Sequence, residues 1–160
     1  MAIEIERKYA VIGDFKSLST VHYDIAQGYL STVPERTVRV RIKNDKGFLT
    51  IKGKAHNNGI SRYEWEKEIS VHEAEDLLNL CEPFVIRKTR YEVYFENQKF
   101  EIDEFYAENE GLLIAELELE SEDTIVNKPL WLGAEIVNDE RYFNSQLSKN
   151  PFKLWSKSNN

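Results

Sequence analysis

The sequence predicts an α+β protein built on an eight-stranded antiparallel β-barrel, a tunnel with a charged interior and helices packed outside. Charged residues recur at every second position of most predicted strands, so each strand has one ionised face. The order strand, helix and three further strands occurs twice, which gives two β-α-β-β-β halves and enough strands to close a barrel. The polar face of an ordinary antiparallel sheet is mixed and mostly neutral. An ionised face on nearly every strand therefore indicates a wet, functional interior.

The first predicted strand, residues 2–9, shows the alternation clearly. Glu4, Glu6 and Lys8 fall at a period of two, so their side chains share one face of the strand. Apolar or aromatic residues occupy the other face. The later strands follow from the same alternation and from β-branched or aromatic content. They are predicted at residues 23–32, 37–43, 48–54, 62–70, 86–96, 99–105 and 112–120.

The clearest helix is predicted over residues 71–82. Ser70 and Glu73 form a capping box at its start, and Pro83 follows its end. Helices in these positions would cover the apolar outer face of the barrel. Shorter helices are predicted at residues 14–20, 122–128 and 143–149.

Length and composition favour one domain, residues 1–150, followed by a C-terminal tail, residues 151–160. A chain of 160 residues with 41% hydrophobic content can bury a sizeable core. Its single cysteine excludes an intrachain disulfide and fits a reducing compartment. We find no secretory signal and no apolar run of transmembrane length. These features predict a cytoplasmic protein that does not interact with membranes.

The distribution of charge tells more than its sum. A net charge of −7 argues against nucleic acid as a partner. Residues 36–62 contain eight basic residues and one acid, whereas residues 92–123 contain twelve acids and one base. The basic region therefore suits the binding of an anion, and the acidic region suits the binding of cations. A polyphosphate that carries divalent metal ions satisfies both.

The basic strands supply candidate substrate-binding residues. Arginine offers bidentate contacts to phosphate oxygens, and lysine offers a point charge. The alternative is a solvated basic hairpin, which the recurrence of charged faces on successive strands disfavours. The candidates are Arg39, Arg41, Lys52, Lys54 and Arg90, with Lys8, Arg62 and Arg141 as further candidates.

Two E-x-E pairs supply candidate metal ligands, Glu4 with Glu6 and Glu116 with Glu118. Carboxylates crowded into one cavity repel each other and need a hard cation such as Mg²⁺ or Mn²⁺. The alternative for the second pair is an exposed acidic edge. Glu64 is a further candidate, either as a metal ligand or as a group that orients a basic neighbour or a water.

The remaining polar residues have simpler interpretations. Lys8 would pair with the two glutamates on its own face and contact phosphate or water. Glu101 and Asp103 would hold arginines in place by ion pairs. The three histidines have no metal-ligand spacing, and Cys81 fits core packing better than a nucleophile.

These residues resemble the motifs of the CYTH proteins, the triphosphate tunnel metalloenzymes. Residues 4–8, Glu-Ile-Glu-Arg-Lys, match the ExExK signature, which is weak alone because short charged motifs are common. An ordered set of further matches across residues 2–148 makes the resemblance specific. The set comprises residues 27–30, 39–41, 50–52, 62–66, 88–91, 101–103, 116–118 and 139–142.

The resemblance is closest to the short bacterial inorganic tripolyphosphatases. It implies metal-dependent hydrolysis of inorganic tripolyphosphate, a small-molecule substrate, with Mg²⁺ (or Mn²⁺) as cofactor. It also implies that Lys88 and Tyr29 face the tunnel and act in substrate selection. Together with Glu4, Glu6 and Lys8, they form the predicted catalytic set.

Three alternative functions stay open. They are a class IV adenylyl cyclase that makes cyclic AMP from ATP, a thiamine triphosphatase, and a non-catalytic polyphosphate-binding module. Retention of both acidic pairs argues against the last, because binding alone needs the bases more than a metal cage. Inward positions are almost all charged, with Tyr29 as the main aromatic exception, so little is available to recognise a nucleobase. Oligomeric state is also open, with a homodimer as one option.

Overall fold

The computed structural model describes residues 3–57 and 59–155. The strands are β1 (Ile3–Val11), β2 (Val21–Ser31), β3 (Arg36–Lys43), β4 (Lys46–Gly53), β5 (Ser61–Ile69), β6 (Ile86–Phe95), β7 (Gln98–Phe105), β8 (Leu113–Glu118) and β9 (Leu132–Ile136). The helices are α1 (Val71–Leu78) and α2 (Asn144–Leu147). Single 3₁₀ turns are η1 (Lys16–Leu18), η2 (Ala107–Asn109), η3 (Glu140–Tyr142) and η4 (Phe152–Leu154).

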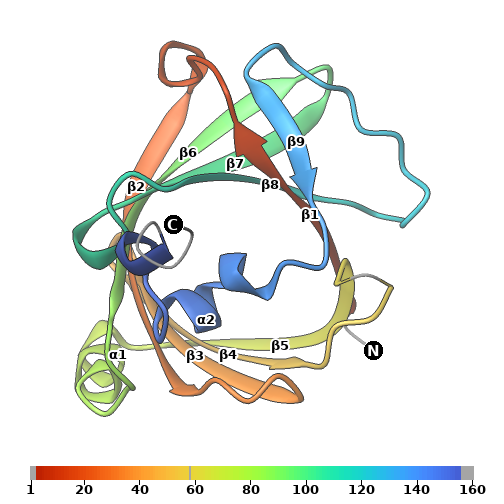
Figure 1. The fold of residues 1–160 in the computed structure, drawn as a ribbon. Coiled ribbons are helices and arrows are strands. Elements are labelled where there is room, and N and C mark those ends of the chain that lie inside the picture. The colour runs from red at the N-terminus through yellow and green to blue at the C-terminus, as the bar shows by residue number, and fades with distance from the viewer. Residues whose placement is uncertain (1–2, 58, 156–160) are drawn as a thin grey trace.

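Eight antiparallel strands form the predicted closed barrel, in the order β5-β4-β3-β2-β6-β7-β8-β1 (Figure 1). Strand β1 closes it, because its first residues, Ile3–Ile5, pair with β5 while its other edge pairs with β8. The eight-stranded antiparallel barrel is therefore confirmed. Closure leaves every barrel strand with two neighbours over part of its length, which removes the exposed sheet edges that promote aggregation.

Strand β9 was not predicted. It pairs with the second half of β1, beyond the segment that meets β5. It is only five residues long and contains Gly133, so its sequence has little alternation to detect. The glycine fits a close approach, because a Cβ there would lie 3.0 Å from the carbonyl oxygen of Ala10.

Helix α1 packs outside the barrel, as predicted, against β3 and β4. Its capping box is present: the Ser70 hydroxyl accepts a hydrogen bond from the Glu73 amide, and the Glu73 carboxylate accepts one from the Ser70 amide. The helix ends at Leu78, four residues before the predicted end. A Cβ on Gly47 of β4 would lie 2.9 Å from the Ala74 Cβ, so this close packing requires glycine.

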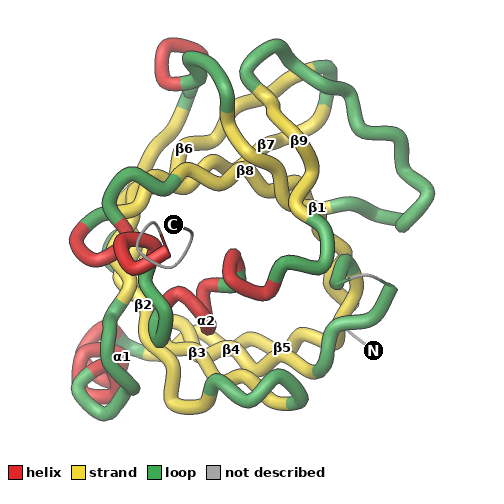
Figure 2. The backbone as a smooth tube through the Cα atoms, in the orientation of Figure 1, coloured by secondary structure: helices red, strands yellow, loops and turns green. Residues whose placement is uncertain are grey.

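The other predicted helices differ from expectation. Residues 14–20 form only η1, and the predicted helix at 122–128 is wrong, since this segment is part of the long loop between β8 and β9 (Figure 2). The Gln98 side chain donates to the Ile125 carbonyl and accepts from the Asn127 amide, at 2.9 and 2.8 Å. These bonds occupy backbone groups that a helix would use.

Helix α2 differs in position as well as length. The predicted helix at 143–149 has only four α-helical residues, and it lies across one end of the barrel rather than on its outer face (Figure 1). A hydrophobic cluster holds the C-terminal segment there, and Leu147 and Trp155 contribute to it. The cluster's other buried members are Tyr29, Ile86, Phe105, Leu112 and Ile114.

A second cluster of buried hydrophobic residues packs along β1, β6, β7 and β8, with Phe15 and Trp131 covering it from adjoining loops. Of the predicted C-terminal tail, residues 151–155 pack onto the barrel end, and Trp155 is 5% exposed. Residues 156–160 lie outside the described residues. No helix among residues 3–57 and 59–155 is long and apolar enough to cross a lipid bilayer.

Candidate functional site

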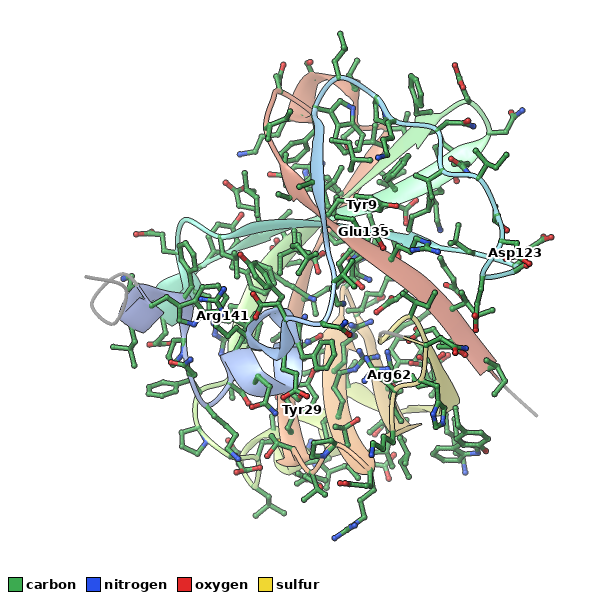
Figure 3. The ribbon with its side chains drawn as sticks, turned by 45° about the vertical axis from the view of Figure 1, so that its right-hand side comes forward. Tyr9, Tyr29, Arg62, Asp123, Glu135 and Arg141 are labelled. Atoms are coloured by element: carbon green, nitrogen blue, oxygen red, sulfur yellow. The ribbon has the colours of Figure 1, made fainter. Side chains whose placement is uncertain are left out.

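The barrel encloses a cavity of about 200 Å³ whose lining residues are mostly charged, and we call it the tunnel cavity. It lies inside the ring of strands because alternate residues of each strand point inward. Figure 3 labels two of its lining residues, Tyr29 on β2 and Arg62 on β5. The predicted site residues that line it are Glu4, Glu6, Lys8, Tyr29, Arg39, Arg41, Lys52, Arg62, Glu64, Lys88, Arg90, Glu116 and Glu118.

Two predicted substrate-binding residues do not line the tunnel cavity. Lys54 follows the last residue of β4, where the strand alternation ends, and its side chain is exposed. Arg141 lies on η3, where its guanidinium forms two hydrogen bonds with Asp139, at 2.6 and 2.9 Å. The same guanidinium lies 4.8 Å from the ring centroid of Trp155. Arg141 therefore holds the C-terminal segment together in this structure.

Lys8 connects the two E-x-E pairs. Its Nζ lies 3.1 Å from Glu6 Oε1 and 3.2 Å from Glu116 Oε2. Burial raises the pKa of Glu6, and the nearby Glu116 raises it further. Burial opposes ionisation of Glu116 too, but Lys8 and Arg90 hold its pKa well below the ordinary value. The two carboxyl groups therefore share one buried environment, in which the positive charge of Lys8 favours the ionised form of each.

A second ion-pair group lies where β1 meets β5. Lys52 Nζ lies 2.8 Å from Glu4 Oε1 and 3.4 Å from Glu64 Oε2. The Arg62 Nε lies 3.7 Å from the same Glu4 oxygen. Burial lowers the pKa of Lys52, although Glu6 and Glu4 oppose the shift. Barrel closure creates this group, because Glu4 and Arg62 are direct partners across the β1–β5 pairing.

Asp103 organises a third group, in the role predicted for it. Its carboxylate accepts two hydrogen bonds from Arg90, at 2.7 and 2.9 Å, and one from Lys88 at 2.7 Å. Arg90 also lies 3.4 Å from Glu116. Burial lowers the pKa of Lys88 to about 7, even though Asp103 opposes the shift. The Lys88 amine can therefore exchange a proton near neutral pH.

Arg39 and Arg41 bring positive charge to the tunnel cavity. Arg39 has one ion pair among the described residues, a 3.5 Å contact with the partly exposed Glu66, and it donates a hydrogen bond to the Thr50 hydroxyl at 3.2 Å. Arg41 donates through Nε to the Gln27 side-chain oxygen, at 2.9 Å, and has no ion pair within 4 Å among the described residues. Burial, with Arg39 and Arg90 nearby, lowers the pKa of Arg41 to about 9. Arg39 Nε is buried without a hydrogen-bond partner in the described part of the chain. A buried donor without an acceptor is costly, and an anion in the cavity would supply one.

The acids of the tunnel cavity suit a hard cation but are not assembled around one. No three carboxylates of residues 3–57 and 59–155 stand in a metal-binding arrangement, since Lys8 and Lys52 separate them. Glu118, however, has a pKa raised by burial and by the charges of Glu4 and Glu6. A divalent cation would relieve this repulsion, and carboxylate oxygens are the ligands it prefers. The donor set therefore fits Mg²⁺ or Mn²⁺.

Several site residues escaped the sequence analysis, and Gln27, Lys43 and Asn144 are among them. Gln27 is fully buried, and its Nε2 donates to Asn144 Oδ1 at 2.8 Å. Gln27 has the same strand parity as Tyr29 on β2 and contacts Arg41, and Lys43 continues the alternation of Arg41 and lines the tunnel cavity, so parity alone could have found both. Asn144 of α2 also accepts a hydrogen bond from Lys88, at 3.0 Å. No local sequence pattern identifies Asn144 as a site residue, because only the tertiary fold of the C-terminal segment brings it to the tunnel cavity.

The chain is similar to known proteins over nearly its whole length. Residues 2–149 match the CYTH domain. An inorganic triphosphatase from Acetivibrio thermocellus is 51% identical over 156 residues, which cover 96% of this chain and 97% of that protein. An inorganic triphosphatase from Nitrosomonas europaea is 34% identical over 149 residues, which cover 91% and 96%. The crystal structure of an inorganic triphosphatase aligns with a TM-score of 0.66 and 32% identity, covering 91% of this chain and 97% of that one.

Proposed function

Because this chain belongs to the CYTH family, we propose that it is a metal-dependent hydrolase that cleaves inorganic tripolyphosphate inside its barrel. One observation carries the proposal. Arg41, which has no ion pair within 4 Å among the described residues, and Arg39, whose buried Nε has no hydrogen-bond partner there, line the same small cavity as the carboxylates Glu6 and Glu116. A polyanion that arrives with a divalent cation would neutralise both walls of the cavity. The relatives named inorganic triphosphatase support the same substrate.

The basic wall binds and orients the phosphates. Arg39 and Arg41 donate hydrogen bonds to phosphate oxygens, and charge-assisted bonds of this kind are stronger than neutral ones. Arg90 is already held by Asp103 in a fixed orientation, so it adds positive charge without reorganisation. Lys52 and Arg62 complete the basic wall toward β1 and β5. This fixed positive charge stabilises the negative charge of the transition state.

The acidic wall holds the cation. Its ligands would be Glu6, Glu116 and Glu118. Two further carboxylates, Glu4 and Glu64, lie nearby and form ion pairs with Lys52 in this structure. Bound Mg²⁺ or Mn²⁺ would polarise the phosphoryl oxygens and activate water. When its carboxylate partners bind the cation, Lys8 would exchange one of them for a phosphate oxygen of the substrate.

Lys88 would act as a proton acceptor in this mechanism. With a pKa of about 7, its amine is partly neutral in the free enzyme and can accept a proton from the water that attacks the terminal phosphorus, while the bridging P–O bond breaks and pyrophosphate leaves. Asp103 and Asn144 hold the Lys88 Nζ in place, at 2.7 and 3.0 Å. The Tyr29 hydroxyl, whose pKa burial raises, stays protonated and serves as a hydrogen-bond donor toward the substrate.

Cavity size favours the inorganic substrate over a nucleotide. A volume of about 200 Å³ lies below the roughly 300–1,000 Å³ typical of sites for drug-sized ligands. An adenylyl cyclase must seat adenine and ribose in addition to the phosphates. Among the described residues that line the tunnel cavity, only Tyr29 and Phe143 offer aromatic surface for stacking. The cyclase and thiamine triphosphatase alternatives are therefore less well supported.

A phosphate-release assay with Mg²⁺ or Mn²⁺ tests the proposal, with tripolyphosphate, ATP, thiamine triphosphate and pyrophosphate as substrates. We expect kcat/KM for tripolyphosphate to exceed that for ATP at least about tenfold, or about 1.4 kcal/mol in transition-state binding. Cyclic AMP as the main product from ATP, formed as fast as tripolyphosphate is cleaved, would favour the cyclase. Binding of tripolyphosphate without any turnover would favour the non-catalytic module.

A cytoplasmic location belongs to the same proposal, while the oligomeric state is open, with a homodimer as one option. The location rests on the single cysteine. Cys81 is a free thiol, and burial raises its pKa to about 11, which keeps it unreactive. Cell fractionation tests the location, and light scattering at several protein concentrations tests the dimer.

A further inference from the structure

Two amide side chains join Arg41 to Lys88 by hydrogen bonds. Arg41 donates through Nε to Gln27 Oε1 at 2.9 Å, and Gln27 Nε2 donates to Asn144 Oδ1 at 2.8 Å. The same Asn144 oxygen accepts a hydrogen bond from Lys88 Nζ at 3.0 Å. Gln27 is fully buried on β2, whereas Asn144 belongs to α2, 117 residues away in sequence. Gln27 therefore reaches Lys88 through Asn144.

Arg41 fixes the direction of every bond in this chain. A guanidinium group can only donate, so Gln27 must present its amide oxygen to Arg41 and its amide nitrogen to Asn144. An amide nitrogen can only donate as well, so Asn144 must present its oxygen. The reversed orientation of either amide would set two donors or two acceptors against each other. The group that Asn144 places beside Lys88 is therefore an acceptor.

This acceptor leaves one defined position free on the Lys88 amine. Asn144 Oδ1 at 3.0 Å and Asp103 Oδ2 at 2.7 Å each accept one N–H from Lys88 Nζ. When Lys88 loses a proton, its two remaining N–H groups can stay with these acceptors, and the lone pair takes the third position. Lys88 lines the tunnel cavity, so the lone pair is left for a group bound there. A donor in place of the Asn144 oxygen would instead compete for the lone pair.

The orientation of Gln27 bears on Tyr29 in the same way. Gln27 Nε2 lies 3.4 Å from the Tyr29 hydroxyl oxygen and donates to it. Because the hydroxyl accepts from Gln27, its own proton is left to donate to another group. Tyr29 lines the tunnel cavity, where a phosphate oxygen would be that group.

We propose that Gln27 and Asn144 are positioning residues that aim two reacting groups at the substrate. They direct the lone pair of neutral Lys88 toward the attacking water and the hydroxyl proton of Tyr29 toward a phosphate oxygen. This inference rests on the proposed hydrolase activity, in which Lys88 accepts a proton, and adds the residues that orient it. Both amides are uncharged and act by orientation. The charged groups that act on Lys88 are Asp103 of β7, Arg90 of its own strand, Arg41 of β3 and Glu116 of β8.

The first test removes each amide and measures tripolyphosphate hydrolysis with Mg²⁺. Asn144→Ala and Gln27→Met should each lower kcat by about 10- to 100-fold, because a small displacement of a reacting group has an effect of this size. In Asn144→Ala, KM should change less than kcat. Gln146→Ala is the matched control, because it removes an amide from the same helix outside the tunnel cavity, and it should leave kcat unchanged. An unchanged kcat in a folded Asn144→Ala, shown by circular dichroism, overturns the proposal.

A double-mutant cycle tests whether Asn144 acts through Lys88. In the Lys88→Gln background, Asn144→Ala should lower kcat by no more than about twofold, because no amine is left to orient. A loss as large as in the wild-type background would mean that Asn144 acts elsewhere, which refutes the proposal.

The pH profile gives a readout that a merely structural role would not move. Asn144→Asp keeps both acceptor contacts but adds a negative charge beside Lys88, which favours the ammonium form. The acidic limb of kcat/KM should therefore lie about one to three pH units higher than in the wild type. Gln146→Glu adds the same charge to the same helix outside the tunnel cavity and should move the limb less. A limb that stays in place in Asn144→Asp contradicts the proposal.

NMR titration of the Lys88 side chain in the free protein separates this inference from the proposed function. If the wild type releases no phosphate from tripolyphosphate with Mg²⁺ or Mn²⁺, the proposed function fails, and the titration alone decides the inference. Asn144→Asp should raise the pKa of Lys88. Gln27→Met should lower it, because the released Asn144 amide no longer holds its oxygen beside the ammonium. A Lys88 pKa that is the same in all three proteins refutes the inference, whether or not the wild type is active. If Asn144→Ala does not fold, Asn144→Asp carries the test in both assays.

Discussion

Lys88 Nζ lies 2.7 Å from Asp103 Oδ2 in the wall of the tunnel cavity, and the two side chains are only 1% and 0% exposed. An isolated pair of this kind would keep the lysine charged. Here Arg90 donates two hydrogen bonds to the same carboxylate, and the charges of Arg90 and Arg41 disfavour a second cation beside it. Burial and this competition lower the pKa of Lys88 to about 7.

The first prediction concerns pH. In the free enzyme, Lys88 is charged below about pH 7 and neutral above it. If the neutral amine accepts the proton, kcat/KM should rise with pH up to about 7 and then level off, since this parameter reports the free enzyme. Lys88→Gln should lose about 10²–10⁴-fold in kcat and also lose this acidic limb. The pH–rate profile of the variant is the check, because substrate ionisation affects both enzymes equally. An acidic limb of unchanged position in Lys88→Gln contradicts the assignment.

The second prediction concerns the metal. Glu116→Gln keeps the size of the side chain but removes the charge that would hold a hard cation. We expect turnover to collapse and the Mg²⁺ concentration for half-maximal rate to rise, while the fold survives. Calorimetric titration with Mg²⁺ gives a second readout that does not depend on activity. Glu120→Gln is the matched control, because Glu120 continues the same glutamate alternation but is exposed and lies outside the tunnel cavity. Normal activity of Glu116→Gln at limiting Mg²⁺ would rule out the ligand role.

The third prediction concerns the phosphate-binding wall. Arg41→Ala should weaken metal-free binding of tripolyphosphate by about 1.5–3 kcal/mol, the range for hydrogen bonds to charged groups. Lys54→Ala removes an exposed charge from the same basic region and should leave the affinity unchanged. Isothermal titration calorimetry at constant ionic strength measures both. Equal losses in the two variants would mean that only the overall charge of the region matters.

The fourth prediction concerns protons released by metal binding. Burial and neighbouring carboxylates raise the pKa of Glu6, so at mildly acidic pH part of this group carries a proton that a cation must displace. Mg²⁺ binding should therefore release protons, and the observed enthalpy should depend on the ionisation enthalpy of the buffer. Release should fall as pH rises through the raised pKa, because the group is then already ionised. Glu6→Gln should release fewer protons, and an enthalpy independent of buffer in the wild type contradicts the prediction.

Much of the fold and of the site composition follows from local pattern. The period of two placed Arg39, Arg41 and Lys52 on one face of their strands, and the structure brings all three into the tunnel cavity. The capping box predicted the start of α1 at Val71, with Ser70 as its N-cap. Strand direction and helix caps depend on residues a few positions apart, so these features can be derived from the sequence alone.

Other features depend on contacts between distant parts of the chain. Residues 122–128 form a loop instead of a helix, and Gln98 of β7 hydrogen-bonds two of their backbone groups, the Ile125 carbonyl and the Asn127 amide. Arg141 pairs with Asp139 outside the tunnel cavity, although its motif resembles the phosphate-binding set. Strand β9 forms because β5 leaves half of one β1 edge unpaired.

The sequence by itself determined the barrel, its charged interior and the residue types of the site, because side-chain parity is a local property of a strand. The tertiary structure decided which charged side chains pair with each other. Register and closure set Glu4 opposite Arg62 and leave Asp103 shared between Lys88 and Arg90. The fold of the C-terminal segment across the barrel end places Asn144 beside Gln27, 117 residues away in sequence. These pairings arise only when the barrel closes, since the energy of an ion pair depends on distance and burial, which no local pattern encodes.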